Sequence, residues 1–136
     1  MNFPKEYIKQ CDCAEVQGHF ESKNLLYEDQ CIFYSKEYSK VMDIHSDFHS
    51  GFNLKNDGGY IWLPYQHQIF DMIYHYACDL KLSQDFYLWT NWQKKLDSKF
   101  IRDKTLTQLW LMFYMWREHE KLWDGEKWIN EYSREK

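Results

Sequence analysis

The sequence contains no apolar run long enough to cross a membrane. Its longest run, "LWLMFYMW" from Leu109 to Trp116, falls far short of the roughly 20 residues that a membrane-spanning helix needs. The opening "MNFPKEYIKQCDC" carries charges where an export signal would have an apolar stretch. We therefore expect a cytoplasmic protein with no membrane partner.

The chain also lacks the basic surplus of a protein that binds duplex nucleic acid. Its net charge is −4, and residues 1–63 contain six Lys or Arg against ten Asp or Glu. A duplex-binding domain normally presents a basic face to the phosphates. No general affinity for duplex nucleic acid is therefore expected.

Glycine is scarce, at five residues, and no glycine-rich phosphate loop is present. The pair Gly58 and Gly59 occurs in "NDGGY", but no Lys-Ser or Lys-Thr follows it and no helix opens directly after it. The stretch is therefore predicted to be a turn.

Aromatic side chains are abundant instead, since seven Trp and eleven Tyr contribute to an aromatic content of 20%. The 136 residues predict a single domain, residues 1–136. A chain of that length should bury roughly 70% of its unfolded surface, so its core needs neither a metal nor a disulfide. The core does not need so many rings, and we expect some at the surface, where rigid amphipathic rings serve contacts well.

The first half of the chain predicts a sheet. The opening "FPKEYIKQC" is predicted to be a short helix with Pro4 at its first position, and Gly18 is expected to break the helical pattern. Residues 25–63 then contain three segments rich in β-formers or with alternating polarity, "CIFYS", "VMDIHSDF" and "YIWLP". These segments predict a small antiparallel meander.

The second half predicts three helices. Helical spacing is expected over residues 64–80 and 83–101. The third helix should begin at a capping box formed by Thr105 and Gln108 and end at Gly125, and "EKWINEYSREK" is expected to be a short last helix. The predicted fold class is α+β, with a small antiparallel β-meander in the first half packed against a three-helix second half.

The stretch "MDIHSDFHSG" places Asp43, His45, Asp47 and His49 at every second position. On a strand these side chains share one face, but His45 and His49 would lie about 13 Å apart. The two histidines could share a metal only if the strand bends, or on a helix, at i and i+4. We favour a solvated strand face. The alternatives are an interface, an acid/base role, and a metal-dependent enzyme that uses this row, with His45, Asp47 and His49 as candidate ligands.

The four cysteines are expected to be reduced thiols. Cys11, Cys13 and Cys31 could form a Cys₃His zinc set with His19, but the C-x-C-x₅-H spacing does not follow the usual zinc knuckle. Cysteine is also among the most buried residue types, and no local signature marks a nucleophilic thiol or its base. We therefore predict no metal, no cofactor and no catalytic residue.

Residues 89–104 interleave rings with cations. Trp89 and Trp92 precede Lys95 and further basic side chains. Aromatic platforms beside cations suit a small nucleotide or a single strand. The alternative is an amphipathic helix whose lysines face the solvent.

A second aromatic group flanks the end of the last long helix. Trp123 and Trp128 lie on either side of Asp124 and Gly125, which suggests a turn that places one ring beside the other. An exposed part of such a cluster would form a partner surface, because Trp dominates binding hot spots. The candidate binding residues are therefore Trp89, Trp92, Lys95, Trp123 and Trp128.

Two stretches, "IWLPYQHQIFDMI" and "LTQLWLMFYMWREHEKLWDGEKWI", carry the motifs W-L-P-x-Q-x-Q and L-W-L-x-F-x-M…W-D-G-x-x-W. In this order they resemble a family of small phage and prophage proteins. The resemblance implies a phage or mobile-element origin. It implies no activity and no catalytic residue, because the matching positions are apolar, capping or turn residues.

These observations predict a non-catalytic phage accessory protein that binds a host protein in the cytoplasm of an infected or lysogenic host, which includes antagonism of a host defence system. The first alternative is a small-molecule binder that sequesters a nucleotide. The second is the metal-dependent enzyme that uses the histidine row.

Overall fold

The computed structural model describes residues 3–23, 31–44, 59–73, 79–96 and 101–130. Its contacts divide the chain into two compact units. The first unit comprises Met1–Tyr65 and Asp124–Lys127, and the second comprises Gln66–Trp123 and Trp128–Lys136. The single domain expected from the chain length stays a prediction.

Two short helices open the first unit. Helix α1 spans Lys5–Cys11, which confirms the predicted short helix, and Pro4, expected at its first position, is the N-cap residue one position earlier. Helix α2 spans Ala14–Lys23, so the break expected at Gly18 is wrong. Gly18 is exposed, and a Cβ atom added there would meet nothing within 4 Å. An exposed glycine inside a helix costs only about 1 kcal/mol relative to alanine, and the contacts of its neighbours outweigh that cost.

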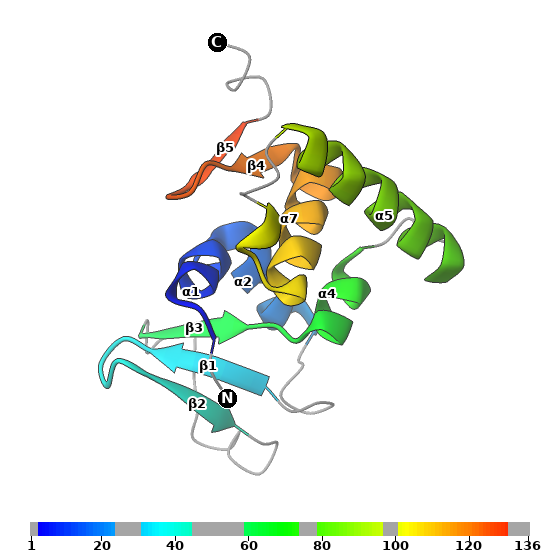
Figure 1. The fold of residues 1–136 in the computed structure, drawn as a ribbon. Coiled ribbons are helices and arrows are strands. Elements are labelled where there is room, and N and C mark those ends of the chain that lie inside the picture. The colour runs from blue at the N-terminus through cyan, green and yellow to red at the C-terminus, as the bar shows by residue number, and fades with distance from the viewer. Residues whose placement is uncertain (1–2, 24–30, 45–58, 74–78, 97–100, 131–136) are drawn as a thin grey trace. The chain divides into compact units, whose positions relative to one another are not determined.

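The first unit also contains a three-stranded antiparallel sheet (Figure 1). Its strands are β1 (Cys31–Ser35), β2 (Lys40–Ile44) and β3 (Tyr60–Leu63), in the order β2-β1-β3. The central strand β1 is apolar and almost wholly buried, as expected for a strand covered on both faces. A small antiparallel sheet therefore precedes the helical half, and the predicted α+β class is confirmed.

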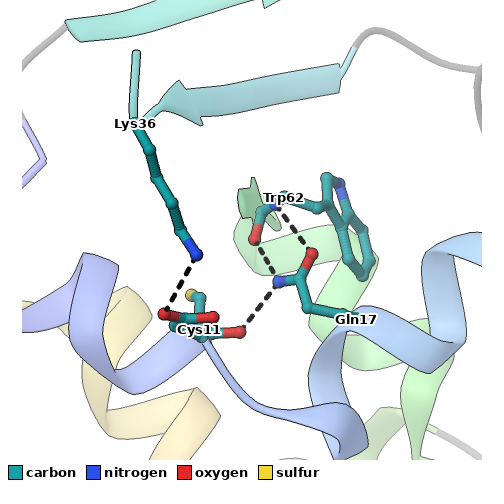
Figure 2. Close-up of polar contacts among 5 residues, drawn as sticks. Cys11, Gln17, Lys36 and Trp62 are labelled. Atoms are coloured by element: carbon teal, nitrogen blue, oxygen red, sulfur yellow. Dashed lines mark hydrogen bonds and ion pairs between the residues drawn. The ribbon is translucent and has the colours of Figure 1, made fainter. Parts of the chain in front are cut away.

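Strand β3 lies at the edge of the sheet, and Trp62 directs both its backbone N–H and its C=O away from the neighbouring strand β1. In an antiparallel pair, alternate residues direct both the N–H and the C=O away from the neighbouring strand. The Gln17 carboxamide of α2 binds both groups: the Trp62 N–H donates to Oε1 at 2.9 Å, and Nε2 donates to the Trp62 carbonyl at 3.0 Å (Figure 2). Gln17 thus takes the place of a neighbouring strand and covers this part of the edge.

The same carboxamide connects α1 to β3. The second hydrogen of Gln17 Nε2 is donated to the carbonyl of Cys11 at 2.8 Å (Figure 2). Nearby, the Nζ atom of Lys36 lies 3.9 Å from a carboxylate oxygen of Asp12. This ion pair is exposed to solvent and contributes little to stability. The part-buried hydrogen bonds of Gln17, rather than the ion pair, therefore connect the helices to the sheet.

Among the residues described in the second unit are the helices α4 (Gln66–Met72), α5 (Asp79–Leu96) and α7 (Leu106–His119). The single helix expected over residues 64–80 is wrong, because α4 stops at Met72. The Ile73 N–H donates to the carbonyl of Phe70 at 3.2 Å, an i→i−3 bond of the kind that tightens the last turn of a helix. Within the described residues, no helix combines the length and the apolar character that a membrane crossing demands.

Helix α7 begins as the sequence predicts. The Thr105 side chain accepts from the Gln108 N–H at 3.1 Å, and the Gln108 side chain accepts from the Thr105 N–H at 2.9 Å, so the capping box is confirmed. Its centre is surrounded by protein, as its apolar character on all sides indicates. Consecutive buried residues run from Trp110 to Met115.

The end of α7 differs from the prediction. The helix stops at Glu120, which adopts a left-handed conformation with φ of 53° and donates its N–H to the carbonyls of Met115 and Trp116. Gly125, the expected stop, instead has φ of 104° within a turn between two short strands. Helices often end at a glycine in the left-handed conformation. Position 120 is a glutamate, which adopts this conformation at a cost in backbone energy, so the sequence did not mark it as the helix end.

A β-hairpin occupies the described part of the segment where the sequence predicted a short last helix, whose residues 131–136 lie outside the described residues. Its strands are β4 (Lys121–Trp123) and β5 (Trp128–Asn130). Trp123 and Trp128 are register partners, and their ring centroids lie 5.0 Å apart. The predicted turn that places one ring beside the other is therefore confirmed.

The capping box gives the first stability prediction. Thr105→Ala should lower the free energy of unfolding by about 1 kcal/mol, because the Gln108 N–H loses its acceptor while the buried side of α7 is unchanged. Urea denaturation measures the difference. Thr105→Ser, which keeps the hydroxyl, should remain close to the wild type, and an equal loss in both variants would show that the cap contributes nothing.

Candidate functional site

An open groove lies between α5 and α7, within the second unit. Its volume is about 430 Å³, within the usual size range of ligand pockets. Four rings form most of its surface, and one aliphatic side chain and two charged side chains complete it. The lining residues are Trp89, Trp92, Phe113, Trp116, Leu88, Asp85 and Arg117. We refer to these residues as the aromatic groove.

Stacked rings hold the floor of the aromatic groove in place. Phe86 on α5 stacks on Trp110 of α7, with centroids 3.7 Å apart and planes 7° from parallel. Trp89 meets Phe113 edge to face at 5.7 Å and 64°. Such pairs contribute about 0.5–1.5 kcal/mol each beyond the area they bury. These stacked and edge-to-face rings, which form the base of the groove, are therefore part of the packed core between α5 and α7.

The rings continue from the core to the solvent. Trp89 is 4% exposed, and its ring centroid lies 6.4 Å from that of Trp116. The ring centroid of Trp116 also lies 6.4 Å from that of Trp92, with the two ring planes at 46°. Trp92 is 44% exposed. Trp92 therefore presents a large apolar surface to solvent while its position is supported by buried rings.

Helix α5 carries further exposed apolar side chains beside the groove. Six large hydrophobic side chains are exposed among the described residues, and four of them are on this one helix, which makes it a candidate contact surface. These four residues, which we call the α5 apolar stripe, are Leu80, Tyr87, Leu88 and Trp92. Helical spacing places them on the side opposite Leu82, Trp89 and Gln93, which are buried.

The groove carries one charge of each sign among its described lining residues. Asp85 forms an ion pair with Lys81, one turn earlier on α5, at 3.1 Å. Arg117 lies in the last turn of α7, where a cation interacts favourably with the helix dipole. The groove is thus mainly apolar with a charged rim, as expected of a site that binds an amphipathic group.

The structure separates the predicted binding residues. Trp89 and Trp92 line the aromatic groove, whereas Lys95 lies on the same helix, is exposed and is not among the lining residues. Trp123 is 5% exposed and packs against Trp128, so this pair stabilises the hairpin.

Leu88 and Arg117 were not identified from the sequence. Leu88 lies one turn before Trp92 on α5, and helical spacing alone could have placed the two together. Arg117 belongs to α7, and its place on the groove depends on how α7 packs against α5. No sequence pattern specifies that packing.

The proposed metal ligands receive no structural support. His45, Asp47 and His49 lie outside the described residues, and of Asp43 only the backbone is described. In the part of the chain that is described, no three His, Cys, Asp or Glu side chains form a group that could hold a metal ion. The alternative Cys₃His set of Cys11, Cys13, His19 and Cys31 is therefore wrong.

Cys11 lies in the core of the first unit. It is fully buried, and burial raises the pKa of its thiol well above the usual 9.0. Burial likewise raises the pKa of Tyr7 above the usual 10.0, and the Tyr7 hydroxyl donates to the carbonyl of Pro64 at 2.6 Å. A thiol that stays protonated is a poor nucleophile, so Cys11 serves packing.

These raised pKa values predict a loss of stability in alkaline solution. Below the ordinary pKa of each group, both the folded and the unfolded chain hold the proton. Above pH 9.0, the ordinary value for cysteine, the unfolded chain loses protons that the folded chain retains, so the free energy of unfolding should fall. The slope is at most about 1.4 kcal/mol per pH unit for each group.

Denaturation between pH 7 and pH 11 measures this effect. Cys11→Ala should reduce the alkaline slope, because one of the two buried groups is removed. Val16→Ala, which shortens a buried side chain that has no proton to lose, is the control: it should lower stability at every pH and leave the alkaline slope unchanged. Identical slopes in the wild type and Cys11→Ala would contradict the assignment.

Comparisons with known proteins give no relative: the chain matches no protein-family model, no curated protein and no solved structure.

Proposed function

We propose that this protein is a non-catalytic binding protein that engages a partner protein through the aromatic groove and the adjoining α5 apolar stripe. One observation carries the proposal. Trp92 is 44% exposed at the mouth of a groove of about 430 Å³, and Leu88 beside it is 64% exposed. Water around these side chains would be released when a partner covers them, which favours association.

The geometry suits a binding hot spot. Hot spots are rich in Trp, Tyr and Arg and are anchored in well-packed surroundings. Trp92 is supported by Trp116, and Trp116 by Phe113 and Trp89. The exposed ring therefore loses little conformational freedom on binding, and this preorganisation strengthens affinity.

The resemblance to small phage and prophage proteins supports a host protein as the partner. A phage protein without a catalytic site acts on its host by occupying a host surface, and antagonism of a host defence system is one form of that action. The buried, protonated Cys11 fits a role without catalysis.

A nucleotide is the alternative ligand of the same groove. Its rings could stack on a base, and Arg117 is the described lining residue that could bind a phosphate. Trp92 and Trp116 already contact one another, so a base would have to lie over them. Calorimetric titration with nucleotides tests this alternative, and saturable micromolar binding lost in Arg117→Ala would favour it.

The double variant Leu88→Ala/Trp92→Ala tests the proposal by affinity capture from host cells. Leu88 is exposed, whereas Trp92 also contacts Trp116, so the variant should lose about 0.5–1.5 kcal/mol of stability and stay folded at the temperature of capture, which circular dichroism checks. It should retain the partner about 30-fold less well or worse, the effect of losing a hot spot of about 2 kcal/mol. The matched control is Tyr38→Ala, which removes a 61% exposed ring from the turn after β1 and should leave capture unchanged.

Two results would count against this function. Equal capture by the wild type and the double variant would place the contact elsewhere on the chain. Loss of capture in Tyr38→Ala to the same extent would show that the interaction depends on general surface hydrophobicity rather than on the groove.

A further inference from the structure

The α5 apolar stripe is edged by positive charge. Lys81, Lys94 and Lys95 are exposed on α5, and the carboxylates in the sequence of this helix are those of Asp79 and Asp85. Arg117 adds a further cation at the groove. This local surplus contrasts with the net charge of −4 of the whole chain. The candidate contact surface is thus a basic area on an acidic protein.

The charges and the apolar side chains follow one line along the helix. Lys81, Leu88, Trp92 and Lys95 stand at i, i+7, i+11 and i+14, positions that share one side of an α-helix, and all four are exposed. The row extends over about 21 Å at 1.5 Å per residue. Two lysines therefore bracket two apolar side chains.

The ion pair on this row does not prevent Lys81 from meeting another carboxylate. The Lys81 side chain is 62% exposed and pairs with Asp85 on the same helix. The Asp85 side chain is 27% exposed, and an ion pair between neighbouring turns of one helix contributes little to stability. A partner carboxylate that also buries Leu88 and Trp92 would compete readily.

We propose that the occupant of this surface is an acidic amphipathic helix of the partner protein, with carboxylates near Lys81 and Lys95 and apolar side chains over Leu88 and Trp92. The inference rests on the binding function proposed above and specifies the partner's chemistry. A helix placed along α5 matches the row in length, and charge complementarity selects its sign and accelerates association.

Two synthetic helical peptides test the inference. They share one apolar face of leucines and differ only at the flanking positions, which are all Glu in one and all Lys in the other. Calorimetry with the full-length protein should give at least ten-fold tighter binding for the Glu peptide at low salt. The difference should shrink strongly at about 0.5 M salt, where the screening length is only a few ångströms.

Variants separate the contributions of charge and apolar contact. Lys81→Glu/Lys95→Glu should reverse the preference between the peptides, and Leu88→Ala/Trp92→Ala should weaken both. Lys36→Glu, an exposed lysine of the first unit, is the matched control and should leave the preference in place.

The outcomes distinguish this inference from the function on which it rests. Equal affinity for the two peptides, tighter binding of the Lys peptide, or no binding of either overturns the acidic helix. The proposed binding function survives each of these results if capture from host cells still depends on Leu88 and Trp92. It fails if that capture is independent of both residues, whatever the peptides do.

Discussion

Replacing Phe113 with alanine should lower the free energy of unfolding by about 3–5 kcal/mol, the usual cost of deleting a large buried ring. Phe113 is fully buried and contacts rings of both helices, Phe86 and Trp89 on α5 and Trp110 and Trp116 along α7. Its removal would leave a cavity that the surrounding rings cannot fill without leaving their stacked positions.

Urea denaturation followed by circular dichroism measures this loss. Trp110→Ala should have a similar effect, because Trp110 is 5% exposed and stacks on Phe86. Leu106→Ala is the control on the same helix, since Leu106 is 54% exposed and should change stability by no more than about 0.5 kcal/mol. If both ring deletions were nearly neutral, the apolar centre of α7 would be a contact surface rather than core.

The second large effect is expected at Gln17. Gln17→Met keeps the length of the side chain but removes all three of its hydrogen bonds, to the two peptide groups of Trp62 and the carbonyl of Cys11. Trp62 and Cys11 are buried, and each buried polar group left unsatisfied costs about 1–3 kcal/mol. Allowing for local adjustment, the free energy of unfolding should fall by about 2–4 kcal/mol.

Gln17→Glu distinguishes hydrogen bonding from packing at this site. The carboxylate still accepts from the Trp62 N–H but faces two carbonyl oxygens to which the amide donated. Its pKa should be raised in the folded state, so the variant should be less destabilised at pH 4 than at pH 7. Gly18→Ala, at the exposed neighbour, should not destabilise α2, since alanine is the better helix former. A neutral Gln17→Met would show that the β3 edge does not need this cover.

Local chemistry predicted the starts of elements better than their ends. Pro4 and the Thr105 capping box mark true helix starts, because these residues act on backbone groups within one turn of themselves. Gly18 and Gly125 were misassigned as helix stops. Glycine tolerates a helix interior and a turn as well as a helix end, so its role depends on the surroundings.

The candidate site could be predicted only in part. Trp89 and Trp92 were identified because rings and cations alternate along one segment. The groove itself depends on the packing of α5 against α7, which brings Trp116 and Arg117 beside these rings. Such pairing is decided by side chains far apart in the sequence, and periodicity within either helix does not encode it.

Site-specific photo-crosslinking in host cells tests most directly whether the aromatic groove binds a partner protein. Leu88, exposed at the groove, would be replaced with the photoreactive residue benzoylphenylalanine, and the same residue would replace Tyr38 as the control. If the groove binds a host protein as proposed, one discrete crosslinked host protein should appear from position 88, be absent from position 38, and be lost when Trp92→Ala is added. Crosslinks that are absent at position 88, or that appear equally from both positions, would contradict it.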